Sequence, residues 1–354
     1  MNTSSGVRCC SLEKYSKFDK APETGAIDLD SILQKYRIAV EKAIRHSQFQ
    51  ESPLSQDAQS VMEAGGKRLR PILVLMSCEA VSGQYTTALP AAIAYELAHE
   101  ASLVQDDIID DSDLRHDKET VHKKRGITGA ILVSDLLIFD IFNQLAKYGS
   151  SSLGKRKIAQ LMSYISRSAN LTIKGEFLES HMTKQSKISE NDYLEVAGLK
   201  TGSLLAAASA SGALVGGASE KVTDAMYRFG HNLGIAFQIR DDILDVSGDS
   251  SQLGKPVMKD LQNNSCNIVL IDAMEKADLY KQNKINSMLY KKWFALSDMN
   301  ELLGMLGELK SIEHASKLAE KYTSMSRECL KSLRGSPTKD KLLSLTYALE
   351  TRKV

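Results

Sequence analysis

An acidic pentad, Asp106-Asp107-Ile108-Ile109-Asp110, follows an apolar run in this sequence, and a related pentad, Asp241-Asp242-Ile243-Leu244-Asp245, follows another. The two apolar runs, residues 97–104 and 233–239, are helix-like. On a helix the first and fifth residues of a pentad share a face, and the second lies about 100° around the axis. We therefore expect each pentad to place three carboxylates at one helix end, so that six carboxylates face one cavity.

These carboxylates predict a metal site. Six carboxylates in one cavity would repel one another unless cations lay between them. Their oxygen ligands suit Mg²⁺, which keeps part of its water shell and binds substrate phosphates. A single acidic pentad is more often a solvated helix end, although acidic residues there oppose the helix dipole. Two near-identical pentads instead indicate metal ions that hold a diphosphate.

The rest of the chain predicts an all-α fold. The 354 residues are 43% hydrophobic but only 6% aromatic and include six prolines, which is typical of long helices. Apolar residues recur at spacings of three and four from about residue 27 onward, and the breaks between these runs are short. We expect a disordered tail over residues 1–26. Residues 27–354 are expected to form a single large helical bundle with a central active-site cavity.

Charge and cysteine content exclude several classes of protein. A net charge of +1 gives no reason to expect a nucleic-acid partner or an anionic membrane surface. Five cysteines without metal-ligand spacing are typical of reduced thiols in the cytoplasm. No apolar run in the sequence approaches the roughly 18 residues needed to span a bilayer, so we expect no transmembrane segment.

Basic residues lie near both pentads. The segment Gly65-Gly66-Lys67-Arg68-Leu69-Arg70-Pro71 precedes an apolar helix, and glycines with cations at a helix N-terminus attract phosphate. Arg115 and His116 follow the first pentad, Lys200-Thr201-Gly202 interrupts an apolar segment, and Lys255 follows the second pentad. Each alone is more often surface than site, but their positions beside the pentads favour binding of anionic substrates.

Together these motifs resemble the trans-type isoprenyl (polyprenyl) diphosphate synthase family, from about residue 32 to residue 352. The resemblance implies an all-α homodimer of the isoprenoid synthase type that binds two or three Mg²⁺ ions. It also implies a prenyltransferase of isoprenoid biosynthesis, which joins an allylic diphosphate head-to-tail to isopentenyl diphosphate. The allylic diphosphate ionises, the double bond of isopentenyl diphosphate attacks the carbocation, and a proton is lost.

The resemblance further implies roles for individual residues. The expected metal ligands are Asp106, Asp107, Asp110, Asp241, Asp242 and Asp245, and all of these except Asp245 are also expected to be catalytic, together with Lys200. The expected contacts to isopentenyl diphosphate are Lys67, Arg70, His99 and His116. The expected contacts to the allylic diphosphate are Arg115, Lys200, Thr201 and Lys255, with Gln238 and Phe237 beside the second pentad.

The sequence departs from the family pattern at a few positions. His116 occupies the place of a second arginine, and histidine, with a reference pKa of about 6.5, is only partly charged near neutrality. We therefore predict that affinity for isopentenyl diphosphate weakens above about pH 7. Ser265 and Asn267 replace a lysine and a threonine, and Gln105 replaces a histidine. A catalytically weak or regulatory subunit of a heteromeric synthase is the alternative these changes leave open.

A stripe of small residues bears on product length. Ala91, Ala94, Ala98 and Ala101 follow one another at spacings of three and four. In the family, bulky residues four or five positions before the first aspartate stop the growing chain, and here those positions hold Ser102 and Ala101. With Tyr95 as a deeper floor, we expect a product of C20 or longer, geranylgeranyl diphosphate being favoured. The same stripe is equally typical of close helix packing.

A class I terpene cyclase also uses an aspartate-rich motif. Such enzymes generally pair it with an Asn/Ser/Glu metal site and line their cavity with aromatic side chains. This chain has a second aspartate pentad and a single tryptophan, Trp293, which favours the synthase.

Overall fold

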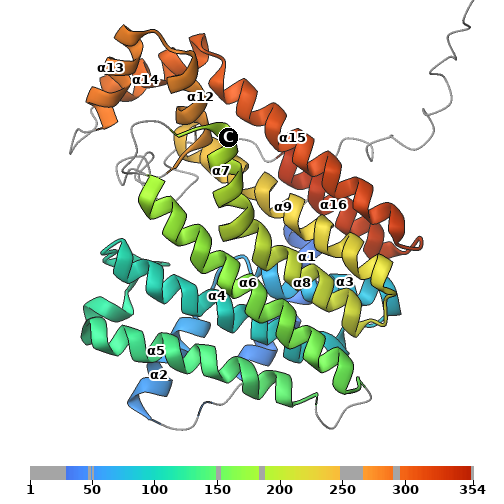
Figure 1. Cartoon of the computed structure of the whole chain (residues 1–354). Coiled ribbons are helices and arrows are strands. Elements are labelled where there is room, and N and C mark those ends of the chain that lie inside the picture. The colour runs from blue at the N-terminus through green and yellow to red at the C-terminus, as the bar shows by residue number, and fades with distance from the viewer. Residues whose placement is uncertain are drawn as a thin grey trace, which may run out of the picture.

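The prediction of an all-α fold is confirmed by a computed structural model (Figure 1). The structure describes residues 29–46, 49, 52–148, 153–182, 188–247, 266–289 and 296–351. Within these ranges the strands are β1 (Leu114–Arg115) and β2 (Lys118–Glu119), which pair antiparallel in a small hairpin. The expected tail over residues 1–26 lies outside the described residues.

The described helices follow one another along the chain. In chain order they are α1 (Leu29–Arg45), α2 (Pro53–Met62), α3 (Leu69–Ser82), the 3₁₀ turn η1 (Thr86–Ala88), α4 (Leu89–Ile109), α5 (Val121–Ala146), α6 (Lys155–Met182), α7 (Glu190–Ala197), the π-helix η2 (Gly198–Gly202), α8 (Ser203–Val215), α9 (Glu220–Ser247), α12 (Ile268–Lys276), α13 (Leu279–Leu289), α14 (Leu296–Glu308), α15 (Ser311–Cys329), the 3₁₀ turn η3 (Leu330–Ser332) and α16 (Pro337–Thr351).

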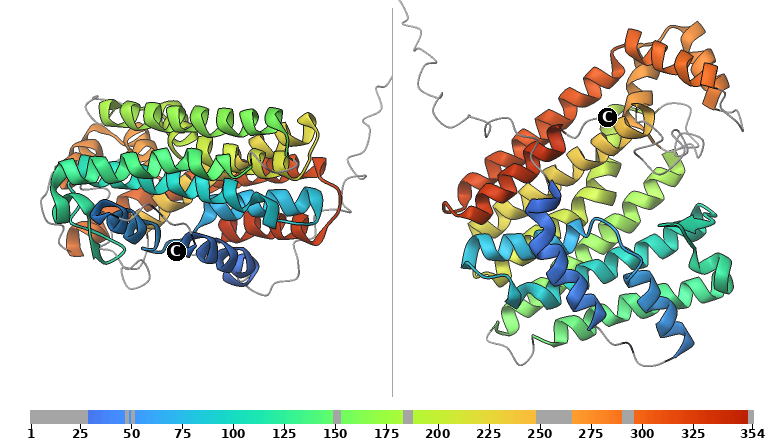
Figure 2. Two further views of the ribbon diagram at one scale, coloured as in Figure 1. Left: turned by 90° about the horizontal axis from the view of Figure 1, so that it is seen from below. Right: turned by 180° about the vertical axis from the view of Figure 1, so that it is seen from behind.

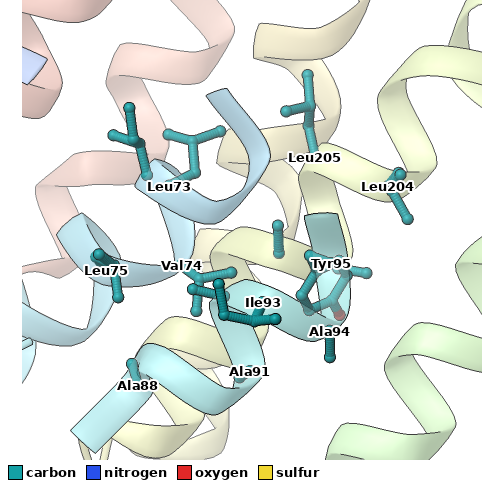
Figure 3. Packing of buried hydrophobic residues seen from close by; sticks show 14 of the residues in the cluster. Leu73, Val74, Leu75, Ala88, Ala91, Ile93, Ala94, Tyr95, Leu204 and Leu205 are labelled. Carbon is teal, nitrogen blue, oxygen red and sulfur yellow. The ribbon is translucent and has the colours of Figure 1, made fainter. Parts of the chain in front are cut away.

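Helix α8 is the centre of the bundle. Every one of its residues is buried, and it contacts α3, α4, α6 and α9. Its many small residues allow these neighbours to come close: a Cβ atom on Gly212 would lie 2.1 Å from the carbonyl oxygen of Val74 in α3. Figure 2 shows how the long helices stack around this centre. Figure 3 shows the apolar packing between α3, α4 and α8.

Helix α9 joins two hydrophobic cores. Met226 and Phe229 in its first half belong to the larger core, formed mainly by α1, α3, α4, α5 and α8. Ile239 and Ile243 in its second half belong to a smaller core, which includes residues of α7, α12, α14 and α15. The second acidic pentad therefore lies within a helix that packs against a hydrophobic core in each half, which fixes its position.

Helix α5 carries apolar side chains on its buried face and on its exposed face. By length and hydropathy it is sufficient to cross a membrane, which differs from the expectation that no run in the chain approaches that length. One face packs on α4 and buries Asp140 with Gln144, which are hydrogen bonded to each other at 3.0 Å. The other face is exposed. We call the exposed set Ile127, Ile131, Leu132, Phe139 and Phe142, with Met162, Ile173 and Phe177 of α6, the α5/α6 apolar face.

Candidate active site

The aspartates of the first pentad, at the C-terminal end of α4, point in two directions. Asp106 and Asp110 lie one turn apart, and their electrostatic neighbours are Lys200 and residues of α6. Asp107 points elsewhere: its Oδ1 accepts hydrogen bonds from Arg115 Nε at 2.8 Å and Nη2 at 2.7 Å. It lines a separate cavity of about 70 Å³ between α2, α4, the hairpin and α5.

Burial raises the pKa values of carboxyl groups in the first pentad, which favours the binding of a cation. Burial raises the pKa of Asp106 to about 6; the charges of Lys200 and Arg115 oppose this shift, and those of Glu176 and Asp110 add to it. Burial also raises the pKa of Asp110. Carboxylates whose ionised form is disfavoured in this way gain from a bound cation, and protons compete with that cation.

In the second pentad, too, the second aspartate has different surroundings from the first and the fifth. Asp242 is buried, its Oδ1 accepts from Gln238 Nε2 at 3.0 Å, and its Oδ2 accepts from the backbone N–H of Ile268 at 3.0 Å. Asp241 and Asp245 lie one turn apart and are partly exposed. The second aspartate of each pentad is therefore engaged by donors of the protein itself, and metal binding by all six carboxylates remains a prediction.

Asn267 connects the second pentad to the start of α12 through hydrogen bonds. It is the N-cap of α12: its Oδ1 accepts from the backbone N–H of Val269 at 2.9 Å, and its Nδ2 donates to the carbonyl of Asp242 at 3.1 Å. This departure from the family pattern therefore has a structural role. Ser265 and Lys255 lie outside the described residues.

Lys200 and Thr201 occupy the π-helix η2, a form that is often found at functional sites. Glycines of the two neighbouring helices admit this turn: a Cβ on Gly175 would lie 2.7 Å from the backbone nitrogen of Lys200, and one on Gly234 would lie 2.7 Å from Gly202 Cα. Thr201 Oγ1 donates to Gln238 Oε1 at 2.9 Å. A chain of hydrogen bonds thus runs from the π-helix through Gln238 to the second pentad.

A group of cations surrounds His99. Burial lowers the pKa of His99 well below its usual value, and the positive charges of Arg70 and Arg115 lower it further, so the ring is neutral near pH 7. Arg70 Nε is buried and donates to no protein acceptor among the described residues. Lys67 Nζ lies 5.2 Å from the centre of the Phe237 ring, which brings the glycine-rich segment next to α9. This arrangement suits a diphosphate.

Comparison with known proteins identifies the family. The model of the family described as polyprenyl synthetase matches residues 51–306. The chain belongs to this family. The geranylgeranyl diphosphate synthase of Methanosarcina mazei is 33% identical over 296 residues, which cover 83% of this chain and 88% of that protein.

Further relatives agree with this membership. The geranylfarnesyl diphosphate synthase of Aeropyrum pernix is 31% identical over 279 residues, 78% of this chain and 86% of that one. A crystal structure of geranylgeranyl pyrophosphate synthetase from Pyrococcus horikoshii Ot3 has a TM-score of 0.84 at 31% identity, over 92% of this chain and 98% of that chain. The predicted fold type, enzyme class and resemblance to trans-type isoprenyl diphosphate synthases are confirmed.

The metal dependence of polyprenyl synthetases fits the donors present here. Among the described residues, no three carboxylate, imidazole or thiol groups converge closely enough to hold a metal ion by themselves. Two carboxylate pairs each share a face of their helix, Asp106 with Asp110 and Asp241 with Asp245. Mg²⁺ usually binds one or two carboxylates and completes its shell with water and substrate phosphates, so paired carboxylates suit it.

The residues expected to set product length fall into two groups. Ala91 and Ala101 are buried against the α5 side of α4: the Ala91 N–H donates to the Tyr148 hydroxyl at 3.3 Å, and Ser134 Oγ donates to the Ala101 carbonyl at 3.2 Å. Close helix packing therefore accounts for these alanines. Ala98 is half-buried.

Tyr95 and Ser102 lie on the face of α4 that carries Asp106. Ser102 is half-buried, and Tyr95 is fully buried with its hydroxyl 2.8 Å from Ser211 Oγ of α8. Eleven residues of helix place Tyr95 roughly 16 Å from Asp106 along the axis. Figure 3 shows Tyr95 within the apolar packing at this depth. This geometry favours Tyr95 as the deeper floor.

The sequence did not indicate a role at the site for three residues that the structure places near it. Glu176 and Glu179 of α6 hold Lys200, at 2.6 Å and 2.7 Å. Arg68 is buried and forms ion pairs with Glu96 and Glu100 of α4, which anchor the glycine-rich segment. Arg68 resembles its basic neighbours in the sequence, but it is buried and has a left-handed backbone conformation with φ 49°.

Proposed function

We propose that this polyprenyl synthetase condenses an allylic diphosphate with isopentenyl diphosphate, head-to-tail, to give an all-trans prenyl diphosphate of C20 or longer. The observation that carries this proposal is the pairing of two kinds of anion site. Asp106 with Asp110 and Asp241 with Asp245 supply carboxylates for metal-bound diphosphate, and the cations around His99 supply a metal-free site. Geranylgeranyl diphosphate is the favoured product, as in the Methanosarcina mazei relative.

The residues act mainly by position and charge. Two or three bound Mg²⁺ ions would stabilise negative charge on the departing diphosphate. Lys200 and Arg115 would add positive charge to the same group, and Lys67, Arg70 and His99 would hold isopentenyl diphosphate. Phe237 lies next to Lys67, at the boundary of the apolar core that excludes water from the carbocation. The released diphosphate is the proton acceptor in this scheme, so no nucleophilic side chain is required.

A product assay tests the proposal. The purified chain is incubated with Mg²⁺, farnesyl diphosphate and labelled isopentenyl diphosphate, and the products are resolved by length. Chains of C20 or longer are expected. Binding of both substrates without turnover, followed by activity with a second protein, would instead identify a regulatory subunit. Release of hydrocarbon from farnesyl diphosphate alone would identify a cyclase.

We propose that the chain is a cytoplasmic homodimer that associates through the α5/α6 apolar face. Residues such as Ile131, Phe139 and Phe177 expose large apolar side chains there, and burying them against a second copy would remove this surface from water. Light scattering is expected to give twice the chain mass of 38.9 kDa. Phe139→Glu is expected to give the monomer, whereas Leu279→Glu, an exposed apolar position elsewhere, is expected to leave the dimer intact.

Ser102→Phe is expected to shorten the product towards C15. The larger ring would fill the face of α4 between Asp106 and Tyr95, where the growing chain runs in this proposal. The product distribution after a fixed time measures the effect, and Ser102→Ala is the matched control with unchanged length. Ala101→Phe is expected instead to destabilise the protein, by about 1–3 kcal/mol, because Ala101 is packed against α5. An unchanged product from Ser102→Phe would contradict this path for the chain.

His116→Arg is expected to lower the KM for isopentenyl diphosphate about threefold to tenfold at pH 8, and less at pH 6. His116 faces the glycine-rich segment, with Nε2 3.8 Å from the position of a Cβ on Gly66. An ordinary histidine is largely neutral at pH 8, whereas arginine keeps its charge and binds phosphate with two parallel hydrogen bonds. Steady-state kinetics at both pH values measure this. A wild-type KM that stays flat from pH 6 to pH 8 would count against the role of His116.

A further inference from the structure

The ammonium group of Lys200 is held by α6. Its Nζ lies 2.6 Å from Glu176 Oε2 and 2.7 Å from Glu179 Oε2. The two glutamates are three residues apart on α6 and therefore share a face. All three side chains are mostly buried, with exposed fractions of 34%, 24% and 20%. Contacts of this kind are screened by water less than a surface ion pair is.

The two glutamates carry more negative charge than the single positive charge of Lys200. Burial alone would lower the pKa of Lys200, but the charges of Glu179 and Glu176 raise it above its usual value, so the lysine is fully charged. Glu176 also acts on Asp106 and Asp110 of α4. Lys200 therefore lies between carboxylates of two helices, and although Arg115 also acts on Asp106 and Asp110, the carboxylates outnumber these two cations. A diphosphate that enters this region without metal meets repulsion.

The backbone of Lys200 is closely packed, whereas its side chain can rotate. The backbone is confined by Gly175, and its carbonyl accepts from Thr172 Oγ1 at 3.5 Å. The side chain has a flexible four-carbon stem and a compact charge that can change partners by rotation. An exchange of partners therefore requires rotation of the side chain and no movement of η2.

We propose that Glu176 and Glu179 are positioning residues that hold Lys200 away from the diphosphate until metal-bound diphosphate competes for it. The inference rests on the proposed function, in which Lys200 contacts the allylic diphosphate. Before metal ions bind to the aspartates, Lys200 serves as the counter-ion of the nearby carboxylates. When the diphosphate arrives with its metal ions, the lysine exchanges the two glutamates for phosphate oxygens. The two glutamates thus lower the affinity for free diphosphate.

Binding of inorganic pyrophosphate, measured by calorimetry without and with Mg²⁺, tests this inference. Without metal, Glu176→Gln and Glu179→Gln are each expected to tighten binding about threefold to tenfold, because each removes one carboxylate that competes for Lys200. With Mg²⁺ the gain is expected to be smaller. The matched control is Glu195→Gln, which removes an exposed carboxylate paired with Lys174 of α6, and it is expected to leave binding unchanged.

Kinetics separate positioning from a general structural role. Glu176→Gln is expected to lower the KM for the allylic diphosphate at limiting Mg²⁺ while kcat changes less than twofold. Equal effects of Glu176→Gln and Glu195→Gln would overturn the inference. So would weaker pyrophosphate binding in Glu176→Gln, with weaker binding of Mg²⁺, because Glu176 would then hold metal directly. If Lys200→Met fails to weaken pyrophosphate binding, the role of Lys200 in the proposed function is overturned instead.

Discussion

Asp106→Asn and Asp241→Asn are each expected to lower kcat/KM about a thousandfold. In both pentads the second aspartate is buried and engaged by protein donors, whereas the first is partly exposed, so the first is the side chain proposed to bind metal. Asparagine keeps the size of the side chain but removes the charge that binds Mg²⁺, and the metal contribution to the barrier is several kcal/mol. Initial rates over a wide range of Mg²⁺ concentration measure the effect.

Asp242→Asn is expected to behave differently. Its two oxygens accept from Gln238 and from the backbone of Ile268, and an amide can accept only one of these bonds. The variant is therefore expected to lose about 1–3 kcal/mol of stability, while the Mg²⁺ concentration for half-maximal rate stays near that of the wild type. A Mg²⁺ requirement raised as far as in Asp241→Asn would show that Asp242 binds metal.

The pH dependence of stability gives a second readout for Asp242. Burial raises the pKa of this carboxyl to about 7, although the Ile268 N–H and the Gln238 amide lower it in part. The folded pKa exceeds the unfolded value, so the stabilising contribution is present at low pH and is lost as pH rises through about 7. The melting temperature of the metal-free protein is therefore expected to fall between about pH 4 and pH 7, and Asp242→Asn is expected to reduce this fall.

The bundle and the outline of the site could be predicted because both depend on local spacing. Apolar residues at spacings of three and four specify helices wherever they pack, so the all-α fold follows from periodicity. Helix geometry also places Asp106 with Asp110 on one face and Asp107 on another. The contacts around His99 followed from the family resemblance, and the structure brings His99, Arg70 and Arg115 together.

The partners of the buried charges could not be predicted, because they depend on contacts between distant segments. Ile268 binds Asp242 through its backbone N–H, a group that every residue except proline carries, so its side chain gave no signal. Glu176 and Glu179 resemble any acidic pair on a helix until α6 is placed beside η2. The cytoplasmic location, the homodimer and the role of Lys255 remain predictions.

Arg68→Met is expected to lower the free energy of unfolding by about 3–5 kcal/mol at pH 8. The guanidinium of Arg68 is fully buried and pairs with Glu41, Glu96 and Glu100, of which the last two are also buried. Methionine has a similar shape but no charge, so it leaves two carboxylates in the core without their cation. Urea unfolding measures the loss. A loss of less than about 1 kcal/mol would mean that the ion pairs contribute little.

The size of this loss is expected to depend on pH. Burial raises the pKa of Glu100 to about 8, and the negative charge of Glu96 adds to the shift, so protons already stabilise this pair in the folded protein. Without Arg68 both carboxyls would bind protons more strongly, and the defect is expected to be smaller at pH 6 than at pH 8.5. Adding Glu96→Gln and Glu100→Gln to Arg68→Met removes the buried charges and is expected to restore most of the stability. The KM for isopentenyl diphosphate is expected to be higher than that of the wild type in this triple variant, because Lys67 and Arg70 flank the anchor that has been lost.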